Sequence, residues 1–259
     1  MGDSMKKGDI VGRKSYHSDI VFIISYIEED VAILQGLYVR LVADSPLSDL
    51  ELIDHSELSR MEQKAAEYEK SIVEAYQNKM GHITGKILHL DSDPFYLSKC
   101  MNLYKSLNIY AYGVELDEID FENQIMSYIE TIRPNIVVLT GHDSYNRKGL
   151  ADLKNYRNTL NFLKAVVKIR ERFSLDDICI FAGACGSNAE ALIAAGANFV
   201  SSFDRKNIEA FDPAIVAVLA AITPFNQVVD INHLYHYSKM RKGSIGGIET
   251  YGKMRLLIR

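Results

Sequence analysis

Hydrophobic and polar positions alternate over short distances up to residue 54. Runs of β-branched residues are separated by polar or glycine-containing turns, a pattern typical of short strands. Five strands are predicted there: Asp9–Lys14, Asp19–Tyr26, Asp30–Leu34, Leu37–Val42 and a segment near Leu50–Ile53. Strands this short and close together indicate a small SH3-like β-barrel over residues 5–54, because a barrel closes its sheet and leaves little exposed edge.

The pattern changes between residues 55 and 80. This segment is rich in helix formers, contains no proline or glycine, and has Ser56 as a capping residue near its start. Its charges of mixed sign are typical of a solvated helix. Residues 55–80 are therefore predicted to form a helical connector between two domains.

From residue 84 onward, short apolar runs alternate with amphipathic stretches. The apolar runs predict strands buried on both faces: Lys86–Leu90, Tyr110–Glu115, Asn135–Thr140, Asp177–Ala182 and Ala197–Ser201. The stretches between them predict helices: Pro94–Leu107, Asp120–Ile132, Leu150–Phe173 and Asn188–Ala195. This order predicts an α/β domain over residues 81–259, a doubly wound, mostly parallel sheet with helices on both sides.

Composition and charge exclude several classes of protein. Of the 259 residues, 47% are hydrophobic, enough for a packed core and too many for a disordered chain. A net charge of −5 and a pI near 5.8 argue against nucleic acid as a partner. No apolar run approaches the roughly 18 residues of a membrane span. We expect a cytoplasmic protein whose N-terminal barrel serves docking or regulation.

The three cysteines, Cys100, Cys179 and Cys185, are too few and too irregularly spaced for a disulfide framework or a zinc site. The sequence therefore predicts neither a metal nor a cofactor. Cys100 and Cys179 fall within apolar segments and are expected to be buried small hydrophobic residues.

Polar residues follow four of the predicted strands. In doubly wound sheets, ligands and catalytic groups gather at the carboxyl ends of the strands. The polar ends are Asp91-Ser92-Asp93, Gly141-His142-Asp143, Gly183-Ala184-Cys185-Gly186 and Ser201-Ser202-Phe203-Asp204. A histidine and a cysteine thus follow two successive strands, and an imidazole next to a thiol can hold it as thiolate or take its proton.

The order of these residues along the chain favours a caspase-like plan. In that plan the histidine follows one strand and an Ala-Cys pair follows the next, about 50 residues later. His142 and Ala184-Cys185 fit it. Two positions depart from the caspase pattern, since Gly183 replaces a glutamine and Asp143 replaces a glycine.

Six runs of the chain resemble the YabG family, whose members are sporulation-specific cysteine proteases of spore-forming bacteria. These runs are Val11–Tyr16, Lys86–Asp91, Leu139–Asp143, Phe181–Cys185, Ala194–Phe199 and Gly246–Thr250. The resemblance extends over nearly the whole chain. It implies an endopeptidase that cleaves spore coat, morphogenetic or germination proteins after arginine, in the sporulating cell or in association with the spore coat.

The residues at the strand ends then receive expected roles. Cys185 attacks the scissile carbonyl, and His142 acts as general acid and then as general base. The Cys185 amide and an amide of the Gly141–Asp143 turn are expected to hold the oxyanion, with Gly186 beside them. Asp143 either orients His142 or caps the next helix.

Binding an arginine side chain needs a carboxylate that can pair with a guanidinium. Asp91 is the first choice because it continues its strand and is expected to point into the rim. Asp93 is the second choice, with a helix N-cap as its alternative role. Asp204 is the third choice and is alternatively a surface charge. Ser201 and Ser202 are expected to line the substrate groove.

Other interpretations stay open. A glutamine-amidotransferase-like enzyme would use Gly183–Ser187 as a nucleophile elbow with His233 or His236 downstream. A non-catalytic receiver-like domain would hold magnesium on Asp91 and Asp93, and its barrel would bind nucleic acid or protein. The glycine-rich segment 243–250 is expected to form a close turn at the groove edge.

Overall fold

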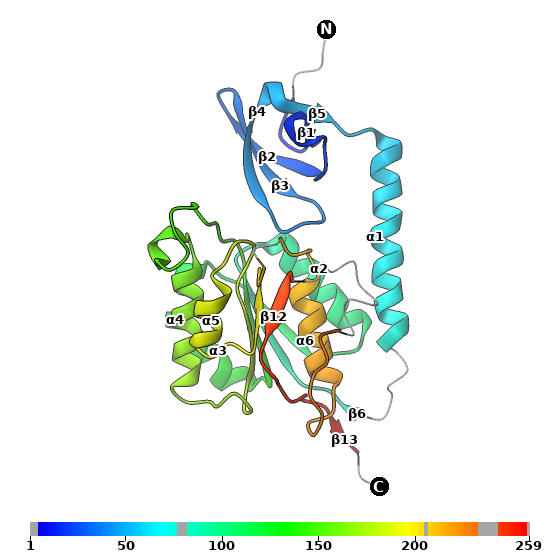
Figure 1. Ribbon diagram of the computed structural model, residues 1–259. Helices are drawn as coiled ribbons and strands as arrows, with labels where there is room; N and C mark the ends of the chain where they lie inside the picture. The colour runs from blue at the N-terminus through cyan, green and yellow to red at the C-terminus, as the bar shows by residue number, and fades with distance from the viewer. Residues whose placement is uncertain (1–4, 77–81, 205–206, 233–242, 258–259) are drawn as a thin grey trace. The chain divides into compact units, whose positions relative to one another are not determined.

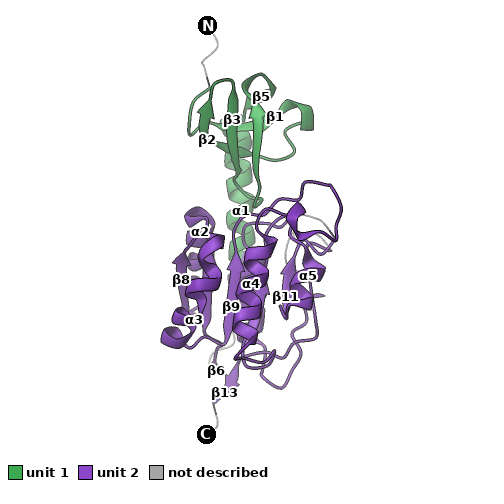
Figure 2. Ribbon diagram, turned by 90° about the vertical axis from the view of Figure 1, so that its left-hand side faces the viewer, with its two compact units in different colours: residues 1–70 green, residues 71–259 purple. Residues whose placement is uncertain are grey.

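The chain forms two compact units, residues 1–70 and residues 71–259 (Figure 2). The computed structural model describes residues 5–76, 82–204, 207–232 and 243–257. The confirmed part of the predicted fold is a mixed α/β chain with an antiparallel sheet followed by a largely parallel one. Closure of the first sheet into an SH3-like barrel and a caspase-like second domain stay predictions.

The first unit is built on a five-stranded antiparallel sheet in the order β4-β3-β2-β1-β5. Its strands are β1 (Ile10–Arg13), β2 (Phe22–Glu28), β3 (Val31–Gly36), β4 (Val42–Pro46) and β5 (Leu50–Leu52). Alternate residues point to one side and form a core of Val11, Phe22, Ile24, Ala32, Leu34 and Leu50. Short 3-10 helices cover Lys14–Tyr16 and Leu47–Asp49. The helix α1 (His55–Tyr76) follows, within the segment 55–80 that was predicted to be helical, and its role as a connector stays a prediction.

The fourth predicted strand, Leu37–Val42, is wrong. The strand that pairs with β3 is β4, in which Val42 lies opposite Gln35 and Pro46 lies opposite Val31. Residues 37–41 instead make the connection, which the Gly36 amide closes by donating to the Leu41 carbonyl. The apolar run extended the prediction into a turn because hydrophobicity alone does not mark where a hairpin reverses.

The second unit contains a six-stranded sheet in the order β12-β11-β10-β9-β7-β8. Its strands are β7 (Ile87–Asp91), β8 (Ala111–Glu115), β9 (Ile136–Thr140), β10 (Cys179–Ala182), β11 (Phe199–Ser201) and β12 (Ile245–Gly247). The first five are parallel, and β12 runs antiparallel to β11. Two further short strands, β6 (His82–Ile83) and β13 (Arg255–Leu256), pair with each other.

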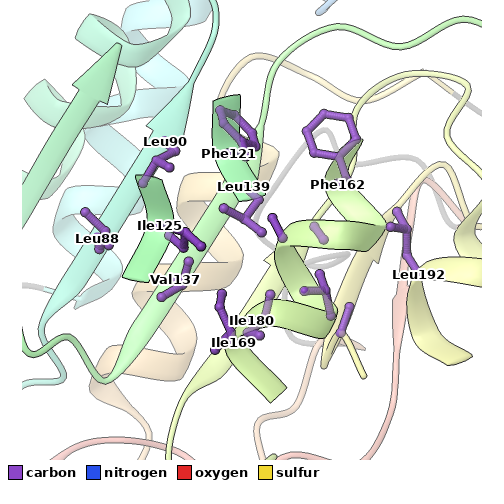
Figure 3. Packing of buried hydrophobic residues seen from close by; sticks show 14 of the residues in the cluster. Leu88, Leu90, Phe121, Ile125, Val137, Leu139, Phe162, Ile169, Ile180 and Leu192 are labelled. Carbon is purple, nitrogen blue, oxygen red and sulfur yellow. The ribbon is translucent and has the colours of Figure 1, made fainter. Parts of the chain in front are cut away.

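Helices cover both faces of this sheet (Figure 1). The helices α3 (Phe121–Ile132), α4 (Thr159–Arg170) and α5 (Ala189–Ala194) pack on one face, and α2 (Pro94–Ser106) and α6 (Asp212–Ile222) lie on the other. Figure 3 shows the core on the α3 and α4 side, where Phe121 and Phe162 approach with ring centroids 5.8 Å apart. All residues of α6 are buried, so it lacks an amphipathic pattern.

Two predictions in this unit are wrong. The helix predicted over Leu150–Phe173 is limited to α4, because residues before Thr159 fold into a loop with a 3-10 turn at Leu153–Asn155. Stacking of Tyr145 on Tyr156 stabilises that loop. The segment predicted as a close turn contains the edge strand β12. A Cβ at Gly247 would lie 2.4 Å from the Asn198 carbonyl oxygen, so only glycine permits this pairing.

Candidate functional site

Three loops meet at the carboxyl edge of the parallel sheet, after β7, β9 and β10. Asp91, the last residue of β7, pairs with Thr140, the last residue of β9. Ala182, the last residue of β10, pairs with Leu139 of β9. The strands therefore end almost level, and the histidine and cysteine loops leave neighbouring strands. The chain also reverses its direction of winding between β7 and β9, where ligands bind in sheets of this kind.

His142 lies two residues beyond β9, with its side chain 26% exposed. Its Nε2 lies 3.4 Å from Oδ2 of Asp93. Its ring packs at a tilt against Tyr96, with centroids 6.2 Å apart. The backbone is held on both sides, since its amide donates to Glu118 (2.7 Å) and its carbonyl accepts from the Asn158 side chain (2.8 Å).

Asp93 is the N-cap of α2, as its alternative role predicts. Its Oδ1 accepts hydrogen bonds from the Phe95 amide (2.9 Å) and the Tyr96 amide (3.4 Å). The side chain is almost fully buried. Because Oδ1 serves the helix, Oδ2 is the oxygen that faces His142. Asp93 thus touches the histidine through one oxygen and α2 through the other.

Cys185 lies three residues beyond β10 in a tight loop and is only 6% exposed. The loop contains Gly183 with φ +106° and Gly186 with φ +80°, values that glycine adopts readily. The Ile208 amide donates to Cys185 Sγ at 3.3 Å. Cys185 Sγ also donates to the Ile208 carbonyl, at the longer distance of 3.9 Å. Of the two contacts, the N–H directed at sulfur favours the anionic form, which is the nucleophile.

Ser201 and Ser202 support the cysteine loop and are fully buried. Both hydroxyls donate to the Ala184 carbonyl, at 2.9 and 3.2 Å. The Gly186 amide donates to the Ser202 hydroxyl at 2.9 Å. The predicted role of lining the groove is untested, and their observed contacts hold the loop that carries Cys185.

Asp143 connects the histidine loop to the cysteine loop. Its Oδ2 accepts hydrogen bonds from the hydroxyls of Thr159 (2.5 Å) and Ser187 (2.9 Å). Its Oδ1 accepts from the Asn158 amide (2.7 Å), at the start of α4. These contacts lie at the start of α4 and include the amide of its N-cap residue Asn158, and both roles predicted for Asp143 stay predictions. The carboxylate facing the His142 ring is that of Asp93.

Glu118, which the sequence analysis missed, joins two of the loops. Its Oε1 accepts from the Ser92 hydroxyl (2.6 Å) and from the His142 amide (2.7 Å). A Cβ at Gly141 would lie 2.3 Å from this oxygen, so the approach requires glycine. A glutamate in the 3-10 turn Glu118–Asp120 after β8 has no local pattern that marks it for this site.

The predicted oxyanion donors are only partly available in this conformation. The His142 amide is engaged by Glu118, and the Gly186 amide is engaged by Ser202. An oxyanion hole formed by the Cys185 amide and another amide of the Gly141–Asp143 turn stays a prediction.

The expectation that Asp91 points into the open rim is wrong. Its side chain is fully buried, because it lies on the same side of β7 as His89, two residues earlier. Asp91 Oδ2 lies 3.7 Å from His89 Nε2, and His89 Nδ1 lies 2.9 Å from the Tyr104 hydroxyl. Asp204, which follows β11, is exposed.

The remaining candidate residues are two cysteines and two histidines. Cys100 on α2 and Cys179 in β10 are buried free thiols, as predicted. His233 and His236 lie outside the described residues.

Within the described part of the chain, no cluster of three His, Cys, Asp or Glu side chains is suited to hold a metal ion. In that same part, no helix combines the length and apolar character needed to cross a membrane.

Two comparisons with known proteins give matches over nearly the full length of the chain. Residues 6–258 match the family model described as YabG peptidase U57. The chain is 37% identical over 278 aligned positions to the sporulation-specific protease YabG of Bacillus subtilis (strain 168), with 96% of both chains covered.

Solved structures resemble this chain only slightly. A probable two-component system response regulator/GGDEF domain protein has a TM-score of 0.32 and 14% identity, covering 52% of this chain and 47% of that one. The A domain of carboxylic acid reductase from Segniliparus rugosus has a TM-score of 0.28 and 12% identity, covering 73% of this chain and 24% of that one. Likenesses this slight carry no argument about function.

The three thiols are expected to differ in reactivity. Burial raises the pKa of the Cys179 thiol to about 12, so at pH 8 only about one molecule in 10⁴ carries its thiolate. Brief treatment of the folded chain with iodoacetamide at pH 8 should therefore label Cys185 and spare Cys179 and Cys100. Peptide mass spectrometry reads the sites, and labelling of Cys179 as fast as Cys185 would contradict this expectation.

Removing the Asp143 carboxylate should destabilise the second unit. Asp143→Ala deprives the Asn158 amide and the hydroxyls of Thr159 and Ser187 of their acceptor, which is expected to lower the free energy of unfolding by about 2–4 kcal/mol. Urea unfolding followed by circular dichroism measures this. Asp117→Ala, an exposed position nearby in the chain, is the control and should change it by less than about 0.5 kcal/mol.

Proposed function

Because the chain belongs to the YabG peptidase family U57, we propose that it is a sporulation-specific cysteine endopeptidase with Cys185 as nucleophile and His142 as general acid and base. The observation that carries the proposal is the placement of these two groups on loops after neighbouring strands β9 and β10. A backbone amide directed at the Cys185 sulfur supports it further.

The proposed reaction is acyl transfer. The Cys185 thiolate forms a C–S bond to the scissile carbonyl, and the C–N bond breaks as His142 donates a proton to the leaving amine. His142 then takes a proton from water as the water oxygen attacks the acyl-enzyme. The C–S bond breaks, the carboxylic acid leaves, and the site returns to the Cys185 thiolate and protonated His142. The two side chains need not touch before substrate binds, since catalytic contacts often tighten only in the complex.

The oxyanion formed in each step needs preorganised donors. We assign this role to the Cys185 amide together with the amide of Gly141 or Asp143 in the turn after β9. Glu118 limits the alternatives, because its carboxylate engages the His142 amide. Each such donor typically contributes about 3–4 kcal/mol to transition-state stabilisation.

The proposed substrate class is the one that the resemblance to the family implies. We infer that the enzyme cleaves spore coat, morphogenetic or germination proteins after arginine, in the sporulating cell or at the spore coat. A caspase-like second domain would supply the chemistry, and an SH3-like barrel over residues 5–54 would contribute docking rather than catalysis. The receiver-like alternative has less support, because Asp93 faces His142 and Asp91 faces His89.

Substitution of the proposed reacting groups should abolish cleavage. Cys185→Ala and His142→Ala should each lower kcat/KM on a peptide substrate by at least about 10³-fold, because each removes one partner of the proton and acyl transfers. Cys100→Ala and Cys179→Ala are matched thiol controls and should retain turnover. Near-normal turnover by Cys185→Ala would exclude it as the nucleophile.

Arginine specificity should depend on a carboxylate, and the structure leaves Asp204 as the exposed member of the predicted set. Asp204→Asn should lower kcat/KM for an arginine peptide relative to a matched glutamine peptide. A loss of about 2–4 kcal/mol corresponds to roughly 30- to 1,000-fold.

The kcat/KM values for the same two peptides are also measured with the variants Asp91→Asn and Asp93→Asn. These two variants should leave the arginine-to-glutamine ratio of kcat/KM at the wild-type value, because both carboxylates are buried against histidines. An unchanged arginine-to-glutamine ratio in Asp204→Asn would show that another group selects arginine.

A further inference from the structure

The carboxylate of Asp93 faces the one ring nitrogen of His142 that is buried. Nε2 has almost no contact with solvent, although the whole side chain is 26% exposed. Asp93 Oδ2 lies 3.4 Å from it. We propose that Asp93 is a positioning residue that keeps the proton of neutral His142 on Nε2 and leaves Nδ1 to exchange a proton with Cys185. The inference rests on the proposed function for the identity of that partner.

Asp93 is fixed strongly enough to orient the ring. Its Oδ1 is held by the amides of Phe95 and Tyr96 at the start of α2. Its own amide donates to Asp91 Oδ1 at 3.0 Å. The carboxylate therefore cannot turn away from His142 without breaking the helix cap.

His142 is equally fixed. Glu118 and Asn158 hold its backbone, and Tyr96 packs against its ring. Both partners of the Asp93–His142 contact are thus positioned by bonds that do not involve substrate. Such preorganisation is what a catalytic histidine requires, because misplacement by about 1 Å can cost 10²-fold in rate.

The chemistry of the two groups fixes the tautomer. A neutral imidazole has one nitrogen that donates and one that accepts, while an ionised carboxylate only accepts. Nε2 must therefore carry the hydrogen when it faces Asp93, which makes Nδ1 the acceptor. At 3.4 Å the two groups are within ion-pair distance but do not form a hydrogen bond, since Nε2 has no hydrogen-bond partner among the described residues. Such contacts shorten and align in the substrate complex.

Two substitutions separate this role from simple helix capping. Asn and Ser cap helices about as well as Asp, so a capping role alone predicts similar activity for Asp93→Asn and Asp93→Ser. With Asn, the carbonyl oxygen remains on the α2 amides and the NH₂ group faces Nε2. Nε2 must then accept, and the proton moves to Nδ1.

We expect Asp93→Asn, the more conservative of the two variants, to lose more activity than Asp93→Ser. Asp93→Asn should lower kcat by about 10²–10⁴-fold with KM within about twofold, as for a wrong-tautomer histidine in other hydrolases. Asp93→Ser removes the partner without imposing the wrong tautomer and should lose less. Equal kcat for wild type and Asp93→Asn, or a larger loss in the Ser variant, would overturn the proposal.

Nitrogen NMR of the full chain labelled with ¹⁵N-histidine tests the tautomer without any assay of activity. The His142 signals among the seven histidines are identified by their loss in His142→Gln. Wild type should show protonated Nε2, and Asp93→Asn should show protonated Nδ1. A wild-type Nδ1–H tautomer overturns the proposal whether or not the variants fold.

The NMR result also separates two kinds of failure. If the wild-type chain cleaves no arginine peptide but shows the Nε2–H tautomer, the proposed protease activity fails and the role of Asp93 in orienting the ring stands. If it cleaves the peptide with the Nδ1–H tautomer, the activity stands and Asp93 has no such role.

Discussion

The arrangement of the site depends on the register of β9 between β7 and β10. Asp91 pairs with Thr140, and Ala182 pairs with Leu139, so all three strands end within a residue of one another. A shift of one residue would turn alternate side chains to the opposite face of the sheet. The apolar residues of these strands, packed between helices on both faces, oppose such a shift.

Carboxylates then convert adjacent strand ends into a rigid rim. Asp93 joins α2 to His142, Glu118 joins Ser92 to the His142 amide, and Asp143 joins the histidine loop to Ser187 of the cysteine loop. Each is largely removed from water, so each requires hydrogen-bond donors to offset its lost hydration. The need to satisfy these carboxylates and the need to fix the loops are met by the same bonds.

The sequence predicted the features that depend on neighbouring residues. Short apolar runs located the five parallel strands of the second unit, and the Gly-flanked turn distinguished Cys185 from the thiols in apolar segments. The sequence did not predict features that are determined by tertiary contacts. Asp91 lies at a strand end, and alternation from His89 places it in the interior. Glu118 and Ile208 reach the site from distant segments. The helix α6 is apolar all round and therefore has no periodic signal.

The three thiols are all buried, and they differ in the groups that surround the sulfur. Cys179 lies inside β10, where desolvation raises its pKa to about 12, and Cys100 donates to the Ala210 carbonyl at 3.6 Å. Cys185 receives a hydrogen bond from the Ile208 amide at 3.3 Å and donates to the Ile208 carbonyl at 3.9 Å. A donor directed at sulfur stabilises negative charge, whereas an acceptor carbonyl opposes it. Ile208 and Ala210 belong to one segment between β11 and α6, so the same stretch of backbone contacts both thiols and directs an N–H at the sulfur of Cys185.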